Sequence, residues 1–159
     1  MIRLLIADDE PLVQIGIKSM LDWSSLGIEI CGTASNGQDA LAMIEKFSVQ
    51  IVITDIKMPI MDGLELMQEC RKRYGSLPLF IVLTSYEEFH LAKQALSLQA
   101  VDYLVKLELT EASLVESVRK AIEMLEGYEP GVKFHNQQVP VETLLFHERF
   151  FIMLLNNLF

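Results

Sequence analysis

The fold is decided by the stretch Ile51-Val52-Ile53-Thr54-Asp55-Ile56-Lys57-Met58-Pro59-Ile60-Met61-Asp62-Gly63. Its first part is a run of mostly β-branched apolar residues, which is typical of a short strand covered on both faces, as in a parallel sheet. Pro59 and Gly63 predict a loop after this strand, and a helix after the loop. Asp55 is then expected at the carboxyl end of a central strand, where ligands of open α/β sheets bind. The chemistry of the protein is therefore expected at this edge of the sheet.

Four more apolar runs predict strands before and after this stretch, at residues 2–7, 28–34, 79–83 and 101–105. Apolar residues at helical spacing predict helices at residues 11–21, 37–47, 63–73, 86–98 and 110–127. Strict alternation of strands and helices favours an α/β fold, with a five-stranded parallel sheet and helices on both faces. Right-handed crossovers make 2-1-3-4-5 the expected strand order, which is the flavodoxin-like arrangement.

The predicted α/β unit closes near Gly127, so residues 1–127 are expected to form one domain. Residues 128–140 are rich in turn-forming proline and glycine and predict a loop. Residues 143–159 predict a helix that is too apolar to remain exposed to water. We interpret residues 128–159 as a linker and the start of a truncated following region; the alternative is a terminal helix that folds back on the same domain.

Composition and charge narrow the class of protein. The 159 residues are 51% hydrophobic, with a mean hydropathy of +0.30, which suits one packed domain of ordinary size. No apolar run approaches the roughly 18 residues of a membrane span, and the N-terminus shows no signal-peptide pattern. We therefore expect a cytoplasmic protein with no membrane contact. The net charge of −9 argues against direct binding of nucleic acid.

Polar side chains collect at the predicted carboxyl edge of the sheet. The ends of the first, third, fourth and fifth strands present Asp8 and Asp9, then Asp55, then Thr84, then Lys106. Three carboxylates in one cleft repel each other, and a hard divalent cation of the Mg²⁺ type, which prefers oxygen ligands, relieves that repulsion. Asp55 is placed to act as a nucleophile toward a phosphoryl group. Lys106 and Thr84 are placed to hold its oxygens.

Some of these acids also have a simpler structural explanation. Asp8 and Asp9 suit the cap of the first helix, and Asp62 with Gly63 suits a turn and the start of a helix. For Asp62 we prefer the structural explanation.

Five motifs follow one another at the ends of the predicted strands and in the loop after the third: Asp8-Asp9, Asp55, Met58-Pro59 with Asp62-Gly63, Thr84-Ser85, and Tyr103-Leu104-Val105-Lys106. In this order they resemble the receiver domain of two-component response regulators. The resemblance covers about residues 1–127. It implies the flavodoxin-like receiver fold.

The resemblance also assigns a role to each residue of the site. It implies that Asp55 accepts a phosphoryl group from a phosphohistidine of a sensor histidine kinase. It implies Mg²⁺ on Asp9, Asp55 and the backbone carbonyl of Lys57, with Asp8 acting through water. Beyond this self-phosphorylation and autodephosphorylation, it implies no enzyme activity on an external substrate.

A switch pair is a further implication of the resemblance. Thr84 and Tyr103 correspond to this pair: the hydroxyl moves toward the phosphoryl group and the ring turns inward. The surface of the fourth helix, fifth strand and fifth helix then changes, and receivers commonly use this surface to form a phosphorylation-dependent homodimer.

Three phrases narrow the resemblance: Ala7-Asp8-Asp9-Glu10-Pro11-Leu12, Ser85-Tyr86-Glu87-Glu88-Phe89 and Leu107-Glu108-Leu109-Thr110. They resemble response regulators that carry an AraC-type helix-turn-helix output domain. This implies a transcription regulator that binds DNA only through an output domain, and no such domain lies within these 159 residues.

Two residues depart from the family pattern. Leu107 follows Lys106 where the family usually has a proline, often with a cis peptide bond, and Gln99 stands where glycine is frequent. A cis bond before a residue other than proline costs roughly 2.5–4 kcal/mol, so we expect the Lys106–Leu107 bond to be trans or strained. This departure leaves open a pseudo-receiver, which would act as a phosphorylation-independent interaction or dimerisation module.

Two other functions fit the expected fold less well. A phosphohydrolase with an aspartate nucleophile would carry an acid two residues after the nucleophile, where this chain has Lys57. A flavodoxin-like module for FMN or a nucleotide would need a phosphate loop after the first strand, where this chain has acids in place of glycines and hydroxyls.

Overall fold

The structure is a computed structural model that describes residues 1–127 of the chain. The predictions for residues 128–159, a linker and the start of a following region, lie outside the described residues. The boundary at residue 127 stays a prediction. Within the described part, no helix combines the length and the apolar character that crossing a bilayer requires.

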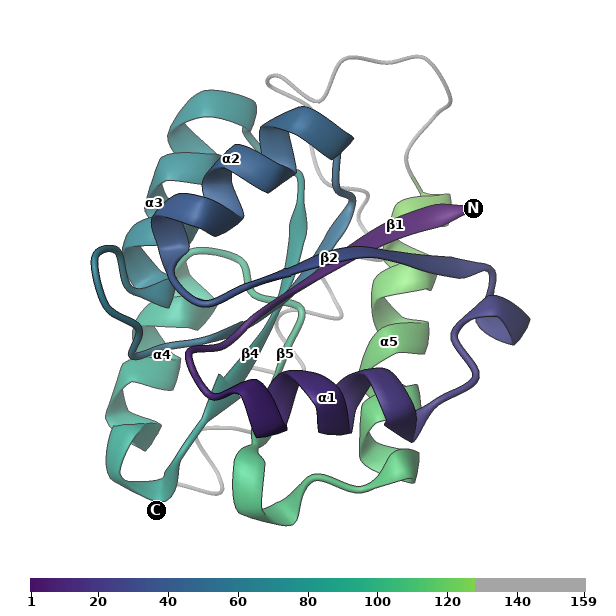
Figure 1. The fold of residues 1–159 in the computed structure, drawn as a ribbon. Helices are drawn as coiled ribbons and strands as arrows, with labels where there is room; N and C mark the ends of the chain where they lie inside the picture. Colours follow the sequence, from purple (N-terminus) through teal and green to yellow (C-terminus); the bar gives the residue numbers. More distant parts are fainter. Residues whose placement is uncertain (128–159) are drawn as a thin grey trace.

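All five predicted strands form one parallel sheet with the order β2-β1-β3-β4-β5, which confirms the predicted fold class (Figure 1). The strands are β1 (Ile2–Ala7), β2 (Ile28–Ala34), β3 (Ile51–Asp55), β4 (Leu79–Thr84) and β5 (Asp102–Val105). Every residue of β3 and β4 is buried, as expected for central strands covered on both faces.

The five α-helices predicted within residues 1–127 lie close to their predicted positions. They are α1 (Pro11–Met20), α2 (Gly37–Phe47), α3 (Gly63–Tyr74), α4 (Phe89–Ser97) and α5 (Glu111–Glu126). Three short 3₁₀ turns join them: η1 (Ser24–Leu26), η2 (Tyr86–Glu88) and η3 (Lys106–Glu108). The helix predicted over residues 86–98 is present, but it begins as the 3₁₀ turn η2, and α4 starts only at Phe89, because Glu88, the last residue of η2, has φ −99° and ψ 5° and lies outside the α region.

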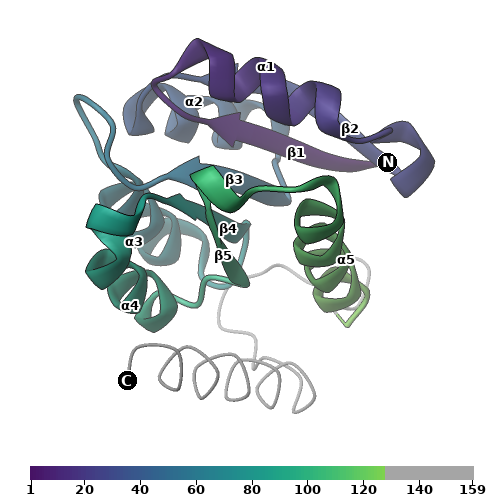
Figure 2. The ribbon, with the colours of Figure 1, turned by 90° about the horizontal axis from the view of Figure 1, so that it is seen from below.

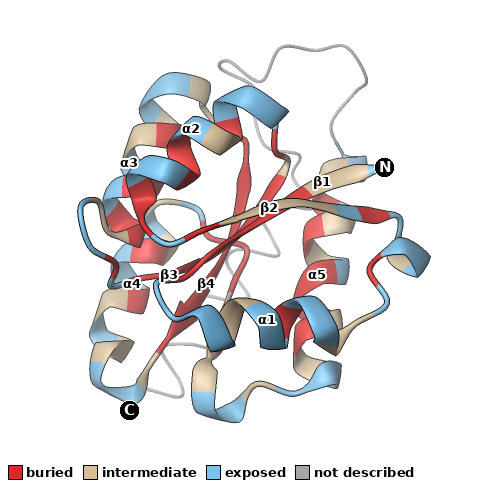
Figure 3. Ribbon diagram, in the orientation of Figure 1, coloured by how far each residue is buried: buried red, intermediate tan, exposed pale blue. Residues whose placement is uncertain are grey.

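Alternate residues of the strands belong to two separate hydrophobic clusters, one on each face of the sheet. Helices lie on both of these faces (Figure 2). α2, α3 and α4 cover one face through residues such as Leu41 and Met67. α1 and α5 cover the other face through residues such as Ile17 and Val118. Figure 3 shows the result: buried residues follow the strands and the inner sides of the helices, and exposed residues lie outside.

The loop after β3 folds back tightly under the end of that strand. The amide of Gly63 donates to the carbonyl of Ile56 at 2.7 Å, and a Cβ atom on Gly63 would lie 2.1 Å from the carbonyl oxygen of Asp55. Asp62 caps α3 through a reciprocal pair of contacts with Glu65. The structural explanation for Asp62 and Gly63 is therefore confirmed, and this packing fixes the backbone of Asp55.

Both departures from the family pattern have a defined backbone. Within residues 1–127, only the Leu77–Pro78 bond is cis, so the Lys106–Leu107 bond is trans, one of the two forms expected. Gln99 has φ 68° and occupies the left-handed region that glycine adopts without steric cost.

Candidate functional site

The parallel register brings the ends of four strands to one edge of the sheet. Ala7 of β1 pairs with Thr54 of β3, and Thr84 of β4 pairs with Val105 of β5. The residues that end or follow these strands therefore lie in one row. They are Asp8, Asp55, Thr84 and Lys106.

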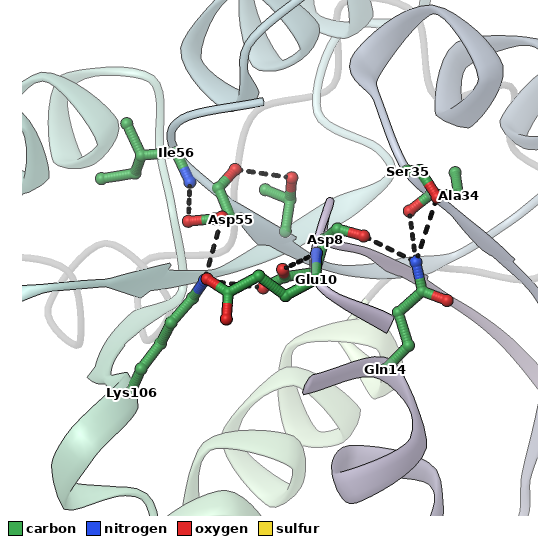
Figure 4. Close-up of polar contacts among 9 residues, drawn as sticks. Asp8, Glu10, Gln14, Ala34, Ser35, Asp55, Ile56 and Lys106 are labelled. Atoms are coloured by element: carbon green, nitrogen blue, oxygen red, sulfur yellow. Dashed lines mark hydrogen bonds and ion pairs between the residues drawn. The ribbon is translucent and has the colours of Figure 1, made fainter. Parts of the chain in front are cut away.

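Lys106 connects the acids of this edge (Figure 4). Its Nζ atom lies 2.9 Å from Oδ2 of Asp8, 3.0 Å from Oδ2 of Asp55 and 3.3 Å from Oε1 of Glu10. The trans peptide bond to Leu107 thus leaves the amine within reach of the acids. One cation is shared by three carboxylates, so the cluster carries excess negative charge.

Asp55 combines burial with a strong shift in protonation. Its side chain is 5% exposed, and its Oδ1 accepts a hydrogen bond of 2.8 Å from the amide of Ile56. Burial is the largest cause that raises the pKa of Asp55, to about 7, and the nearby charges of Asp8 and Glu88 raise it further, whereas Lys106 opposes the shift. The carboxyl group is therefore held in place by hydrogen bonds, but the positive charge of Lys106 does not fully balance the negative charges around it.

Asp8 is fully buried at the end of β1. Burial raises the pKa of this carboxyl, while the hydrogen bond from the amide of Glu10 and the ion pair with Lys106 act in the opposite direction. Gln14 donates to the backbone carbonyls of Asp8, at 2.6 Å, and Ala34, at 3.2 Å, and so ties α1 to two strand ends. α1 has no side-chain cap, so the alternative in which Asp8 and Asp9 cap this helix does not hold.

The acidic cluster fits a hard divalent cation. One carboxylate oxygen from each of Asp8, Asp9 and Glu10 lies within 4.8 Å of the others. All are oxygen ligands, which Mg²⁺ prefers. Oδ2 of Asp8 is buried and takes part in no well-aligned hydrogen bond, although the amine of Lys106 lies near it. The donor set suits a cation, and Asp55 shares the amine of Lys106 with Asp8.

The other predicted residues lie at or near the same edge. The hydroxyl of Thr84 is buried and donates to the carbonyl of Ser85 at 3.0 Å, within its own loop. Tyr103 is half-buried, and its ring meets that of Phe89 edge-on at 5.4 Å between centroids. Lys57 follows Asp55 by two residues and exposes its side chain.

Two contributors to the site had been assigned no role from the sequence. Glu10 contacts Lys106 across 96 residues of chain, and Glu88 acts on Asp55 through its charge. The signal for Glu10 was present, because it is the third acid in succession after the first strand. Glu88 offered no comparable signal, since it stands in an ordinary acidic turn.

Comparison with known proteins identifies the family. The model of the response regulator receiver domain matches residues 4–119, most of the chain. The chain belongs to the response regulator receiver family. Receivers are signalling modules of two-component systems rather than classical enzymes, and they generally bind Mg²⁺ at an acidic site such as the one described above.

Relatives of this receiver are named as transcriptional regulators. It is 38% identical over 126 residues to the uncharacterized transcriptional regulatory protein YesN of Bacillus subtilis (strain 168), covering 79% of this chain and 34% of YesN. It is 31% identical over 106 residues to the transcriptional regulatory protein HptR of Staphylococcus aureus (strain NCTC 8325 / PS 47), covering 67% of this chain and 41% of HptR. The chain thus spans about a third to two fifths of the length of these curated relatives.

Solved receiver structures have the same fold. The receiver domain of AraT, a response regulator from Geobacillus stearothermophilus, is 39% identical, with a TM-score of 0.73 over 78% of this chain and 95% of that chain. A two component transcriptional regulator AraC from Clostridium phytofermentans ISDg is 26% identical, with a TM-score of 0.67 over 79% and 96%. These similarities confirm both the resemblance to response regulators and its narrower form toward AraC-type regulators.

Proposed function

We propose that this receiver is a phosphorylation-activated switch whose phosphoryl acceptor is Asp55. The observation that carries the proposal is the geometry of the Asp55 carboxylate: it is buried at the end of the central strand β3, its Oδ1 is held by the amide of Ile56, and its Oδ2 lies 3.0 Å from the Lys106 amine. The donor is a phosphohistidine of a sensor histidine kinase. An Asp55 oxygen forms the new bond to phosphorus, and the phosphorus–nitrogen bond breaks with its electron pair left on the imidazole.

Lys106 and Thr84 act on the transferred group. Lys106 carries a positive charge at the acceptor oxygen and neutralises charge that builds up on the phosphoryl oxygens. Its pKa is raised by the hydrogen bonds and charges of Asp8 and Asp55, against the effect of burial, so the amine stays protonated at neutral pH. Thr84 donates its hydroxyl to a phosphoryl oxygen after leaving the carbonyl of Ser85, and Tyr103 turns inward with it.

The residues assigned to Mg²⁺ are Asp9, Asp55 and the backbone carbonyl of Lys57, with Asp8 acting through water. When bound, the ion supplies positive charge that balances the carboxylates and the incoming phosphoryl group. The all-oxygen cluster and the buried Oδ2 of Asp8 support this assignment. Asp55 must be ionised to attack, and a nearby cation lowers its raised pKa.

The output of the switch is the control of transcription. Phosphorylation changes the surface formed by α4, β5 and α5, two copies associate through it, and DNA is bound by an AraC-type output domain outside the described residues. Support comes from the relatives, which are named as transcriptional regulators and are longer than this chain. A cytoplasmic location follows from this role, because the kinase donor and DNA are both reached there.

The experiment that tests the proposal is intact-mass analysis after incubation with Mg²⁺ and acetyl phosphate. We expect a gain of one phosphoryl group in the wild type, and none in Asp55→Asn or in the presence of EDTA. A gain that persists in Asp55→Asn would show that another residue accepts the group. No gain by a folded wild-type protein would favour the pseudo-receiver, a module that acts without phosphorylation.

A further inference from the structure

The loops that carry Thr84 and Lys106 are joined by a contact between two exposed side chains. The hydroxyl of Tyr86 donates to Oε1 of Glu108 across 22 residues of chain. Tyr86 begins η2, two residues after Thr84, and Glu108 ends η3, which begins with Lys106. One hydrogen bond therefore connects the two segments on which the phosphoryl-holding groups stand.

The same contact is connected to the hydroxyl of Thr84 through the backbone of the η2 turn, which contains Tyr86, and through the hydrogen bonds that this turn makes. The carbonyl of Ser85 accepts from the amide of Glu88 at 3.1 Å, which closes the η2 turn, and also from the Thr84 hydroxyl at 3.0 Å. Any constraint on η2 therefore acts on the carbonyl that holds Thr84. The bond to Glu108 is such a constraint, because it fixes Tyr86 within that turn.

On the other side, the contact restrains the turn that presents Lys106. The amide of Leu109 donates to the carbonyl of Lys106 at 3.3 Å, which closes η3 with Glu108 inside it. Leu107, between them, is 84% exposed and supplies no packing to hold this turn. The Tyr86 contact therefore adds a restraint that the exposed Leu107 does not supply.

We propose that Tyr86 and Glu108 form a clasp that positions Thr84 and Lys106 together and keeps the Thr84 hydroxyl on Ser85 before phosphorylation. The effect of the clasp on phosphorylation rests on the proposed function, whereas the restraint of the two turns by the Tyr86–Glu108 hydrogen bond does not. Tyr86 and Glu108 are positioning residues, since they act through Thr84 and Lys106. The hydrogen bond to Glu108 also raises the pKa of Tyr86, so the phenol keeps the proton that it donates.

The clasp is tested without phosphorylation by amide hydrogen exchange, measured by NMR at Glu88 and Leu109, the amides that close the two turns. Tyr86→Phe removes one hydroxyl and no charge, and Glu108→Gln weakens the same bond from the other side. Each is expected to speed exchange at both amides about two- to tenfold, the factor of one net hydrogen bond. The double variant should be no faster than the singles. Glu87→Gln, an exposed acid in the same turn, is the matched control and should change neither amide.

Two results would overturn the clasp: exchange that quickens only in the turn carrying the substitution, or single effects that multiply in the double variant. The consequence for function is measured separately, as the rate of Asp55 phosphorylation by acetyl phosphate. Tyr86→Phe releases Thr84 from Ser85, while the ion pairs of Lys106 with Asp8 and Asp55 still hold the amine at the site. The variant should therefore raise this rate about two- to tenfold, while Glu87→Gln leaves it unchanged. A rate in Tyr86→Phe that equals or falls below the wild-type rate would overturn the positioning role. If no variant is phosphorylated at all, the proposed function fails, and the exchange measurement still decides whether the clasp exists.

Discussion

Two regions of this receiver each hold a buried aspartate beside a lysine, yet they differ in how the charge is balanced. At the carboxyl edge of the sheet, Asp55 lies 3.0 Å from Lys106. At the seam between β5 and α5, Asp102 lies 3.5 Å from Lys120 and accepts a hydrogen bond of 2.5 Å from Ser117. Burial is the largest cause that raises the pKa of both carboxyl groups.

The difference lies in the neighbours. In the seam, the remaining contacts to Asp102 are a hydroxyl, the amide of Tyr103 and a cation, and each of them lowers the pKa of its carboxyl group. At the edge, Asp8 and Glu88 act against ionised Asp55, and one amine is divided among three acids. Burial and a raised pKa therefore do not identify a site by themselves. A functional site is instead indicated by several carboxylates that the ends of parallel strands bring close together. Such a cluster is stabilised when an additional positive charge binds to it.

The largest expected effect separates the two aspartates by phosphorylation. Asp55→Asn should abolish the phosphoryl gain, because the amide oxygen is a poor nucleophile, with little loss of stability since a poorly compensated charge is removed. Asp102→Asn should retain the gain. Intact mass and thermal unfolding of both variants check this. Loss of phosphorylation in a folded Asp102→Asn protein would contradict the division between the two regions.

The second test removes each lysine. Lys106→Ala leaves two buried carboxylates without their cation and should lower the free energy of unfolding at pH 8 by about 3–5 kcal/mol. It should still allow Asp55 to react, but the switch should be weakened. Lys120→Ala should cost less, about 1.5–3 kcal/mol, the value of one hydrogen bond to a charged group, because the hydroxyl of Ser117 and a backbone amide still hold Asp102. Urea unfolding at fixed ionic strength measures both, and equal costs would remove the distinction.

A third test uses pH, in the absence of divalent cations. The pKa of Asp55 is raised from 3.8 to about 7, so between these values the folded state keeps a proton that the unfolded state has lost. The contribution of Asp55 to the free energy of unfolding is therefore fully present below pH 4 and is lost as the pH rises to 7. Asp55→Asn removes this dependence. Relative to wild type, the variant should therefore gain stability between pH 4 and pH 8, by at most about 4 kcal/mol.

Asp102→Asn is the matched control for this measurement. Its carboxyl group also has a raised pKa, so the variant should gain in the same direction. The gain should be smaller, because no like charge adds to the effect of burial. Parallel urea titrations across the pH range measure the gain in the free energy of unfolding for both variants. An equal or larger gain for Asp102→Asn would contradict the claim that neighbouring acids add to the raised pKa of Asp55.

The outline of the carboxyl edge was predictable because strand ends are marked locally. A buried apolar run that stops at Asp55 indicates a position in a parallel sheet, and alternation with helices orders the strands. What could not be predicted depends on tertiary contact. The bond from Lys106 to Glu10 spans 96 residues, and no local pattern places these side chains together. The 3₁₀ first turn of the helix over residues 86–98 was not predicted, because the helical spacing of the apolar residues continues through Glu88 although its backbone leaves the α region.

The smallest effect tests whether the seam is stabilised by ordinary hydrogen bonding. Ser117→Ala removes the hydroxyl bond to Asp102 but leaves the Tyr103 amide at 2.9 Å and Lys120 in place. We expect a cost of about 1 kcal/mol, the net value of one hydrogen bond, with the phosphorylation rate unchanged. Ser19→Ala, on the exposed side of α1, removes a hydroxyl that donates to the backbone carbonyl of Ile15 at 2.8 Å, so the difference between the two variants compares a bond to a buried carboxylate with a bond to an exposed backbone carbonyl. A changed phosphorylation rate in Ser117→Ala alone would show that the seam is coupled to Asp55 through β5, and the two regions would then have to be treated as one.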